Sequence, residues 1–221
     1  AASKPKARAA LIGEPTGMKP IAMHKGIMIE KLMIQGKSGH SSNPALGNNA
    51  LHTMHDALGV LRALQSELKA NYHNPLFTID YPTLNLGCIY GDNPNRICGH
   101  SELGFEIRPL PGMDIGELEA LLEQRLLGLG KTEGTQVSMQ HFGVPAFAAD
   151  AGSELVTLCE KLTGHSSESV AFATEAPYLH QLGMDAMVLG PGDINQAHQP
   201  DEYLATDRIK PMLKLLEQVI S

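Results

Sequence analysis

The 221-residue chain is long enough for one large domain or two small ones, and its hydrophobic content of 43% can supply a substantial core. Its formal net charge of −7, with ten histidines counted as neutral, argues against nucleic acid or an anionic membrane as the main partner. No apolar run reaches the ~18–20 residues of a membrane span, and no signal-peptide pattern opens the chain. Three cysteines without metal-site spacing indicate reduced thiols in a cytoplasmic protein.

A polar connector, AASKPK, leads at the start of the chain into a short apolar strand at residues 7–13. Because there is no initiator methionine and the strand is of the buried type, we expect the sequence to be a fragment of a longer protein. The strand ends at Gly13 and presents one carboxylate, Glu14, at its tip. Ligands of open α/β sheets bind beyond the carboxyl ends of strands, which makes Glu14 a functional candidate.

Residues 27–143 show the order strand, helix, strand, strand, helix, strand. The periodicity predicts the first strand at 27–36, a helix at about 48–70, a strand pair at 75–91 and 96–110, a helix at 115–130 capped by Asp114, and a strand at 135–144. This order is that of the split βαβ sandwich. We therefore predict a self-contained domain at residues 28–143.

The remaining residues predict a second domain in two pieces, 1–27 and 144–221. Strands and helices alternate after residue 144, with helices at 150–164, 175–183 and 205–221 and strands at 167–174 and 185–192. Such alternation is typical of a mainly parallel α/β sheet. The fold prediction is thus an α/β protein whose mainly parallel sheet is interrupted by an inserted βαββαβ domain.

A second candidate functional segment is GPGDINQAHQPDEYL, residues 190–204, which follows a buried strand and contains His198. An ordinary solvated loop with an incidental histidine is the simpler interpretation. If Glu14 and His198 lie at neighbouring strand tips, they offer the oxygen and nitrogen ligands that zinc accepts. Two ligands are too few for such a site, and the chain contains no H-x-D, no H-E-x-x-H and no adjacent Glu-Glu.

Six segments together resemble one known family of hydrolases. They are IGEPTGMKPIAMHKG, QGKSGHSSNPALGNNA, FTIDYPTLNLGCIYGD, NRICGHSELGFEIRPLPGM, TEAPYL and LGPGDINQAHQPDEYL. In this order they resemble the acetylornithine deacetylase, succinyl-diaminopimelate desuccinylase and aminoacylase family of co-catalytic zinc enzymes. The resemblance covers essentially the whole chain.

The resemblance implies a catalytic α/β domain with two Zn²⁺ or Co²⁺ ions and an inserted dimerisation domain, or lid, of the βαββαβ kind. It implies that Glu14 is a terminal ligand of one metal and His198 of the other. The family's other ligands, a His-x-Asp motif, a bridging Asp and a Glu-Glu pair containing the general base, precede this region. We therefore expect residues 1–27 and 144–221 to be the C-terminal part of the catalytic domain, and the chain alone to be inactive.

The resemblance also assigns a role to His40, in GKSGHSS. Hydrolysis of an amide passes through a tetrahedral oxyanion, which needs a hydrogen-bond donor. The family places this histidine in the active site of the partner subunit, which implies a homodimer through the lid. Without the resemblance, the simpler interpretation is that His40 belongs to a glycine-rich loop and has no catalytic role.

Four further residues are candidates for contacts with the substrate, and each has a plain structural alternative. Arg108 suits an α-carboxylate or a surface salt bridge, and Asn95 suits a turn or, by resemblance, substrate contact from the neighbouring subunit. Thr174 suits a helix N-cap or a carboxylate site at the helix start, and Glu175 suits the cationic side chain of ornithine. His24 and Lys25 are interpreted as hinge or structural residues.

The function that the resemblance implies is hydrolysis of N2-acetyl-L-ornithine to acetate and L-ornithine in arginine biosynthesis. One alternative keeps the chemistry but changes the substrate to succinyl-diaminopimelate or another N-acyl amino acid. An alternative from a different class is a non-catalytic dimerisation module. An H-x-D motif and a Glu-Glu pair encoded upstream would favour the enzyme.

Overall fold

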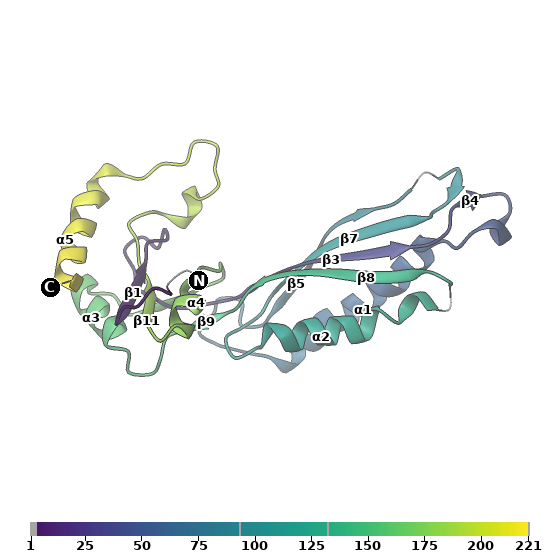
Figure 1. Ribbon diagram of the computed structural model, residues 1–221. Coiled ribbons are helices and arrows are strands. Elements are labelled where there is room, and N and C mark those ends of the chain that lie inside the picture. The colour runs from purple at the N-terminus through teal and green to yellow at the C-terminus, as the bar shows by residue number, and fades with distance from the viewer. Residues whose placement is uncertain (1–3, 93, 132, 221) are drawn as a thin grey trace. The chain divides into compact units, whose positions relative to one another are not determined.

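The computed structural model describes residues 4–92, 94–131 and 133–220. The chain divides into two compact units, which we call the split unit, Ala1–Lys25 with Val144–Ser221, and the inserted unit, Gly26–Gly143. Figure 1 draws both units with their helices and strands labelled. Each unit has its own hydrophobic core.

The split unit is built on a five-stranded sheet. Its strands are β1 (Ala9–Ile12), β11 (Asp185–Val188), β2 (Ile21–His24) and β10 (Glu168–Val170) in spatial order, and β9 (Phe147–Ala148) also pairs with β2. The pairs β1·β11 and β2·β10 are parallel, as expected, whereas β11·β2 and β2·β9 are antiparallel. β2 and β9 were not predicted, because strands of four and two residues are too short to show a period.

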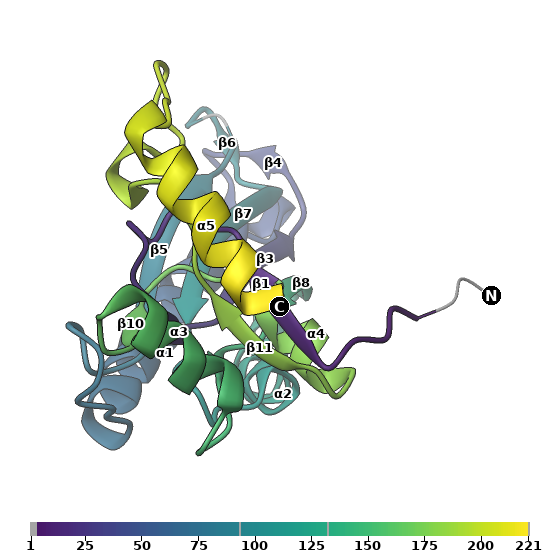
Figure 2. The same cartoon turned by 90° about the vertical axis from the view of Figure 1, so that its left-hand side faces the viewer.

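Helices cover both faces of this sheet. Figure 2 looks onto the face with α3 (Glu154–Thr163) and α5 (Ile209–Ile220), and α4 (Ala176–Gln181) packs on the opposite face. Successive residues of β11 alternate between the two layers: Val188 packs in the cluster that includes α4, and Met187 in the cluster of α3 and α5. A strand buried on both faces explains the continuous apolar run of β11.

The inserted unit contains a four-stranded sheet with two helices on one face (Figure 1). The spatial order is β5 (Thr83–Tyr90), β7 (His100–Arg108), β3 (Ile27–Gln35) and β8 (Gln136–Val144), and the helices are α1 (Ala50–Asn71) and α2 (Ile115–Leu126). A small ribbon of β4 (Gly39–His40) and β6 (Arg96–Ile97) extends from one end. The chain order of the main elements is βαββαβ, which confirms the predicted fold class.

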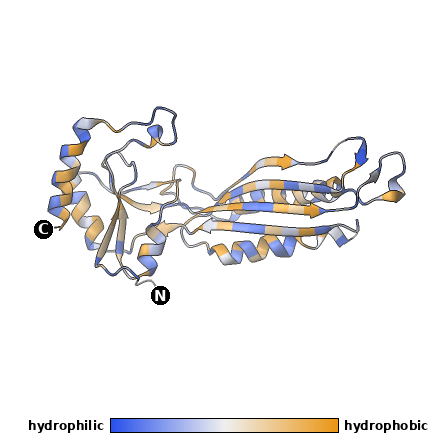
Figure 3. Cartoon of the chain, turned by 45° about the horizontal axis from the view of Figure 1, so that its top comes forward, coloured by the Kyte–Doolittle hydropathy of each residue, from blue (hydrophilic) through white to orange (hydrophobic). Residues whose placement is uncertain are grey.

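Local signals in the sequence explain why these elements form. Along β3, Met28, Leu32 and Ile34 are fully buried while Ile29 between them is 48% exposed, so burial alternates with the two faces of the strand. Figure 3 shows apolar and polar stretches along the strands of the inserted unit. The Asp114 carboxylate accepts a hydrogen bond from Glu117 N at 2.9 Å and starts α2, as predicted. No helix within the described ranges is both long and apolar enough to cross a membrane.

The predicted strand at 75–91 is wrong in its first half, because the ladder begins only at Thr83. The residues that follow Asn74 instead form a turn. The Asn74 side chain accepts a hydrogen bond from Leu76 N, and the Asn74 carbonyl accepts one from Phe77 N. Pro75 lies within this turn and Pro82 directly precedes the ladder, and neither can donate a hydrogen bond to it. An apolar run between two prolines was therefore a poor indicator of a strand.

Candidate functional site

The segments that carry Glu14 and His198 leave the same edge of the split-unit sheet. β1 and β11 are parallel neighbours in register, with Ile12 opposite Val188. Glu14 follows β1 by two residues, and the loop that leads to His198 follows β11. The carboxyl ends of adjacent parallel strands are the positions at which α/β proteins bind ligands.

Thr16 and Gly190 fasten these two segments to each other. The Thr16 hydroxyl accepts a hydrogen bond from Gly190 N at 3.1 Å and lies 3.3 Å from Gly190 O, to which it donates. A Cβ atom on residue 190 would lie only 2.3 Å from the carbonyl oxygen of Glu14. Only glycine allows this approach, so the G-P-G that follows β11 is required by the packing of the Glu14 segment.

The backbone of His198 adopts a left-handed conformation, with φ of 63°. This conformation costs a non-glycine residue ~1–3 kcal/mol and needs support from its surroundings. The support includes Glu202, whose Oε2 accepts a hydrogen bond from His198 N at 3.1 Å. Glu202 was not among the predicted site residues, although an acid four residues after the histidine is visible in the sequence.

The side chains at this sheet edge include ligand types that zinc accepts, but they do not form a complete metal site. Glu14 offers a carboxylate and His198 an exposed imidazole. Among the residues that the structure describes, no group of three or more His, Cys, Asp or Glu side chains could hold a metal ion. A zinc site needs three or four protein ligands. The metal roles of Glu14 and His198 therefore stay predictions.

His40 and Asn95 lie together at one end of the inserted unit. His40 is in β4, Asn95 immediately precedes β6, and the two strands pair as an antiparallel ribbon. The Ser41 hydroxyl donates a hydrogen bond to Asn95 O at 3.3 Å and so joins the two segments directly. Both side chains are exposed. They can reach one ligand, although they are 55 positions apart in sequence.

Arg108 lies at the opposite end of the same sheet. It is the last residue of β7, whereas the β4·β6 ribbon lies beyond the first residue, His100. Eight steps of ~3.4 Å separate the two ends by about 27 Å, so one small substrate cannot contact Arg108 and His40 of the same copy. The Arg108 guanidinium also forms a bidentate ion pair with Glu106, in which Nε donates to Oε1 at 2.7 Å and Nη2 donates to Oε2 at 3.1 Å.

Thr174 is buried and serves as a structural connector in the split unit. Its hydroxyl donates to His24 Nε2 at 3.0 Å and accepts from Ala176 N at 3.1 Å, at the start of α4. Glu175 beside it is exposed and makes no side-chain cap of this short helix. The N-cap of α4 is Glu175, so Thr174 bonds the first helical residue from the position before the cap and is not the predicted N-cap itself. The substrate contacts of Thr174 and Glu175 stay predictions.

His24 is completely buried and held as a neutral imidazole. Nδ1 donates to Lys25 O at 2.8 Å, which leaves Nε2 as the acceptor for Thr174. Burial lowers the pKa of His24, and its hydrogen bonds with the backbone oppose this only in part. The ring also stacks on Phe147, with centroids 5.5 Å apart. His24 is therefore a core residue, as expected.

Acidification is expected to destabilise the split unit through His24. Because the pKa is lower in the folded state, the unfolded state binds a proton first, and stability falls as the pH drops below about 6.5, by at most ~1.4 kcal/mol per pH unit. Thermal unfolding at pH 7.5 and 5.0 should show a smaller difference for His24→Gln than for the parent or for the exposed control His165→Gln. Equal differences in all three proteins would contradict this assignment.

A buried ion pair that the sequence did not signal joins β3 to β8 in the inserted unit. His141 Nδ1 lies 2.5 Å from Glu30 Oε2, and His141 Nε2 lies 3.3 Å from Glu123 Oε1 on α2. The Glu30 side chain is 0% exposed, and its Oε1 has no hydrogen-bond partner in the part of the chain that the structure describes. Burial raises the pKa of Glu30 against the opposing effect of His141. Burial alone would lower the pKa of His141, but Glu30, Glu123 and Glu119 raise it overall.

Residues 22–132 match a family model described as a peptidase dimerisation domain, M20_dimer. Several solved structures share the fold. A tripeptidase from Staphylococcus aureus subsp. aureus Mu50 is 16% identical, with a TM-score of 0.73, over 97% of this chain and 57% of that chain. Aminopeptidase PepT from Bacillus cereus is 17% identical, with a TM-score of 0.72, over 97% of this chain and 58% of that chain. Human carnosine dipeptidase 1 is 13% identical, with a TM-score of 0.64, over 95% and 58%.

These likenesses establish the fold and the extent of the match. At such low identity they carry no information about the substrate. The chain spans a little more than half the length of each of these solved structures. The family match covers most of the inserted unit, including the segments of His40, Asn95 and Arg108.

Proposed function

The chain belongs to the peptidase dimerisation domain family, M20_dimer, and on that basis we propose that the complete protein is a homodimeric, metal-dependent amidohydrolase. We propose N2-acetyl-L-ornithine as its substrate, with acetate and L-ornithine as products. In this proposal the split unit is part of the catalytic domain and the inserted unit is the lid. The proposed protein acts in the cytoplasm on a small N-acyl amino acid.

The observation that carries the proposal is the junction of the loops after β1 and β11. Glu14 and His198 belong to segments that leave neighbouring parallel strands at the same sheet edge and are fastened by Thr16 and Gly190. In the proposal, each residue is the terminal ligand of one of two Zn²⁺ or Co²⁺ ions. When bound, such ions make a water nucleophilic at neutral pH and polarise an amide carbonyl.

The hydrogen bonds of His40 suit the role of oxyanion donor. The backbone N–H of Ser42 donates to His40 Nδ1 at 3.3 Å, and the Ser42 hydroxyl lies 2.7 Å from the same nitrogen. A ring nitrogen that accepts a hydrogen bond carries no proton, so the proton of a neutral imidazole is on Nε2. Nε2–H is then available to an amide oxygen that becomes negatively charged.

The dimer in the proposal follows from the length of the inserted unit. His40 and Asn95 lie about 27 Å from Arg108 along β7, so the two ends of one lid serve two different substrates. We propose that His40 and Asn95 act in the active site of the partner copy and that Arg108, Thr174 and Glu175 act in the site of their own chain.

Removal of a proposed metal ligand is expected to abolish binding of one ion. In the full-length protein encoded around this sequence, Glu14→Ala and His198→Ala should each hold one metal ion fewer per subunit than the parent and lose hydrolysis of N2-acetyl-L-ornithine. Gln199→Ala, in the same exposed loop, is the matched control. Elemental analysis after dialysis and an acetate-release assay measure the two effects.

The substrate class is tested with the same preparation. Preference for N2-acetyl-L-ornithine over N-succinyl-diaminopimelate and over di- and tripeptides would support the proposal. Preference for one of the others would keep the chemistry and change the substrate. A stable dimer that holds no metal and hydrolyses none of these compounds would instead support the non-catalytic module.

A further inference from the structure

Arg96 lies directly opposite His40 in the β4·β6 ribbon. The register pairs His40 with Arg96 and Gly39 with Ile97. Residues directly opposite in an antiparallel pair have their side chains on the same face, with Cβ atoms about 4.5–5.5 Å apart. A ligand that contacts the His40 ring is therefore within reach of the Arg96 guanidinium.

Unlike Arg108 and Arg125 of the same unit, Arg96 has no acidic partner among the described residues. Arg108 is held by Glu106, and Arg125 by Glu67 at 2.7 Å. Within residues 4–92, 94–131 and 133–220, no carboxylate forms an ion pair with the exposed Arg96. An unpaired guanidinium is a ready site for a planar anion such as a carboxylate.

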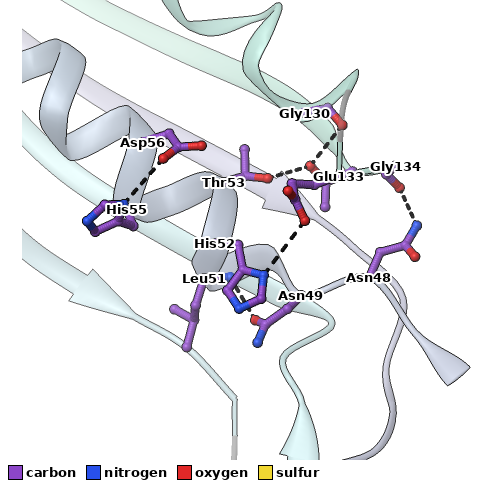
Figure 4. Close-up of polar contacts among 11 residues, drawn as sticks. Asn48, Asn49, Leu51, His52, Thr53, His55, Asp56, Gly130, Glu133 and Gly134 are labelled. Carbon is purple, nitrogen blue, oxygen red and sulfur yellow. Dashed lines mark hydrogen bonds and ion pairs between the residues drawn. The ribbon is translucent and has the colours of Figure 1, made fainter. Parts of the chain in front are cut away.

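Arg96 also lines a cavity of about 520 Å³ at this end of the inserted unit, together with Ser41, Asn48, His52 and Glu133. Figure 4 shows that the side chains of Asn48, Asn49, His52 and Glu133 in its wall already have partners. His52 Nδ1 lies 3.7 Å from Glu133 Oε2, and the Asn48 amide donates to Gly134 O at 2.7 Å. Since Glu133, the one acid among the described residues of this wall, faces His52, Arg96 is the charge of the wall that these residues leave without an ion-pair partner.

An N-acyl amino acid carries its amide oxygen and its α-carboxylate close enough together for the cross-strand pair His40 and Arg96 to contact both. The amide oxygen and the α-carboxylate carbon are joined through the amide carbon, nitrogen and Cα, which spans roughly 3–5 Å with standard bond lengths. We propose, resting on the function proposed above, that Arg96 binds the α-carboxylate of the substrate whose amide oxygen faces His40. Arg96 then selects substrates that carry a free carboxylate next to the scissile amide.

The test compares two substrates that differ only at the carboxylate. In the full-length enzyme, Arg96→Ala should raise the KM for N2-acetyl-L-ornithine about 10- to 100-fold, the effect of losing a charge-assisted contact, and should leave the KM for N2-acetyl-L-ornithinamide unchanged. Arg96→Lys should recover part of the loss, because the point charge remains and the planar fork does not. Arg62→Ala, an exposed arginine on α1 of the same unit, is the control.

The outcomes separate this inference from the function on which it rests. A parent enzyme that hydrolyses N2-acetyl-L-ornithine, with an Arg96→Ala variant that discriminates between acid and amide as well as the parent does, would overturn the role of Arg96 alone. Absence of hydrolysis in the parent would overturn the proposed function. Calorimetric titration of N2-acetyl-L-ornithine into the parent and into Arg96→Ala would then test whether Arg96 binds the α-carboxylate. Weaker binding to the variant would support this contact, and equal affinities would rule it out.

Discussion

Replacing His40 by alanine in the complete enzyme is expected to lower kcat about 10²- to 10³-fold while the KM changes little. A hydrogen-bond donor that meets an oxyanion stabilises the transition state more than the bound substrate, and loss of one such donor costs about 2.7–4 kcal/mol. The protonated Nε2 of His40 suits this role because Ser42 N donates to Nδ1. Steady-state kinetics with N2-acetyl-L-ornithine measure the effect.

Mixed dimers test whether His40 acts in the partner's active site. A His40→Ala subunit combined with a subunit lacking its general base should regain activity, because one of the two hybrid sites then has both groups. His55→Ala is a matched control, since His55 is also exposed and lies 3.3 Å from a neighbouring polar side chain, Asp56. If mixing restores no activity beyond that of the two parents, the cross-subunit role is wrong.

Replacing His141 by alanine is expected to destabilise the inserted unit by about 3–5 kcal/mol, the cost of breaking a buried pair by removing one partner. Glu30, which belongs to β3, would remain buried, and Glu119 and Glu123 of α2 would still lie near it. Its remaining option is to take up a proton, which at pH 7 costs ~1.4 kcal/mol for each pH unit above its ordinary pKa. Hydrogen exchange of the β3 and β8 amides measures the loss.

A second substitution identifies the cause of that loss. Glu30→Leu in the His141→Ala background should restore much of the protection, because an apolar side chain needs no partner in the core. His73→Ala is the control, since His73 forms an exposed contact with Asp80 at 3.2 Å and should change stability by less than ~1 kcal/mol. If Glu30→Leu adds to the damage, the buried carboxylate is not the source of the instability.

The two units are expected to respond to pH in opposite directions. The pKa of His141 is raised in the folded state, so its stabilising effect is complete below about pH 6.5 and is lost as the pH rises through the folded value. The raised pKa of Glu30 acts in the same direction, from about pH 4.5 upward. His24 in the split unit has a lowered pKa and therefore loses its contribution in acid.

Local patterns in the sequence predict most elements of the inserted unit, though not the β4·β6 ribbon or the turn before β5, and they predict the segments that carry the candidate site. Apolar residues at helical spacing, the Asp114 cap and the alternation along β3 act within a few residues of one another, so they can be interpreted without knowing the fold. Glu14 and His198 were recognised in the same way, because a polar segment after a buried strand is a local pattern.

Only the tertiary structure decided which of these segments meet. Thr16 bonds to Gly190 across 174 positions, His24 to Thr174 across 150, and Glu30 to His141 across 111. Strand order and register set these contacts, and both depend on which buried faces pack together rather than on any local period. The same reason explains why Arg96 emerged only as the cross-strand neighbour of His40.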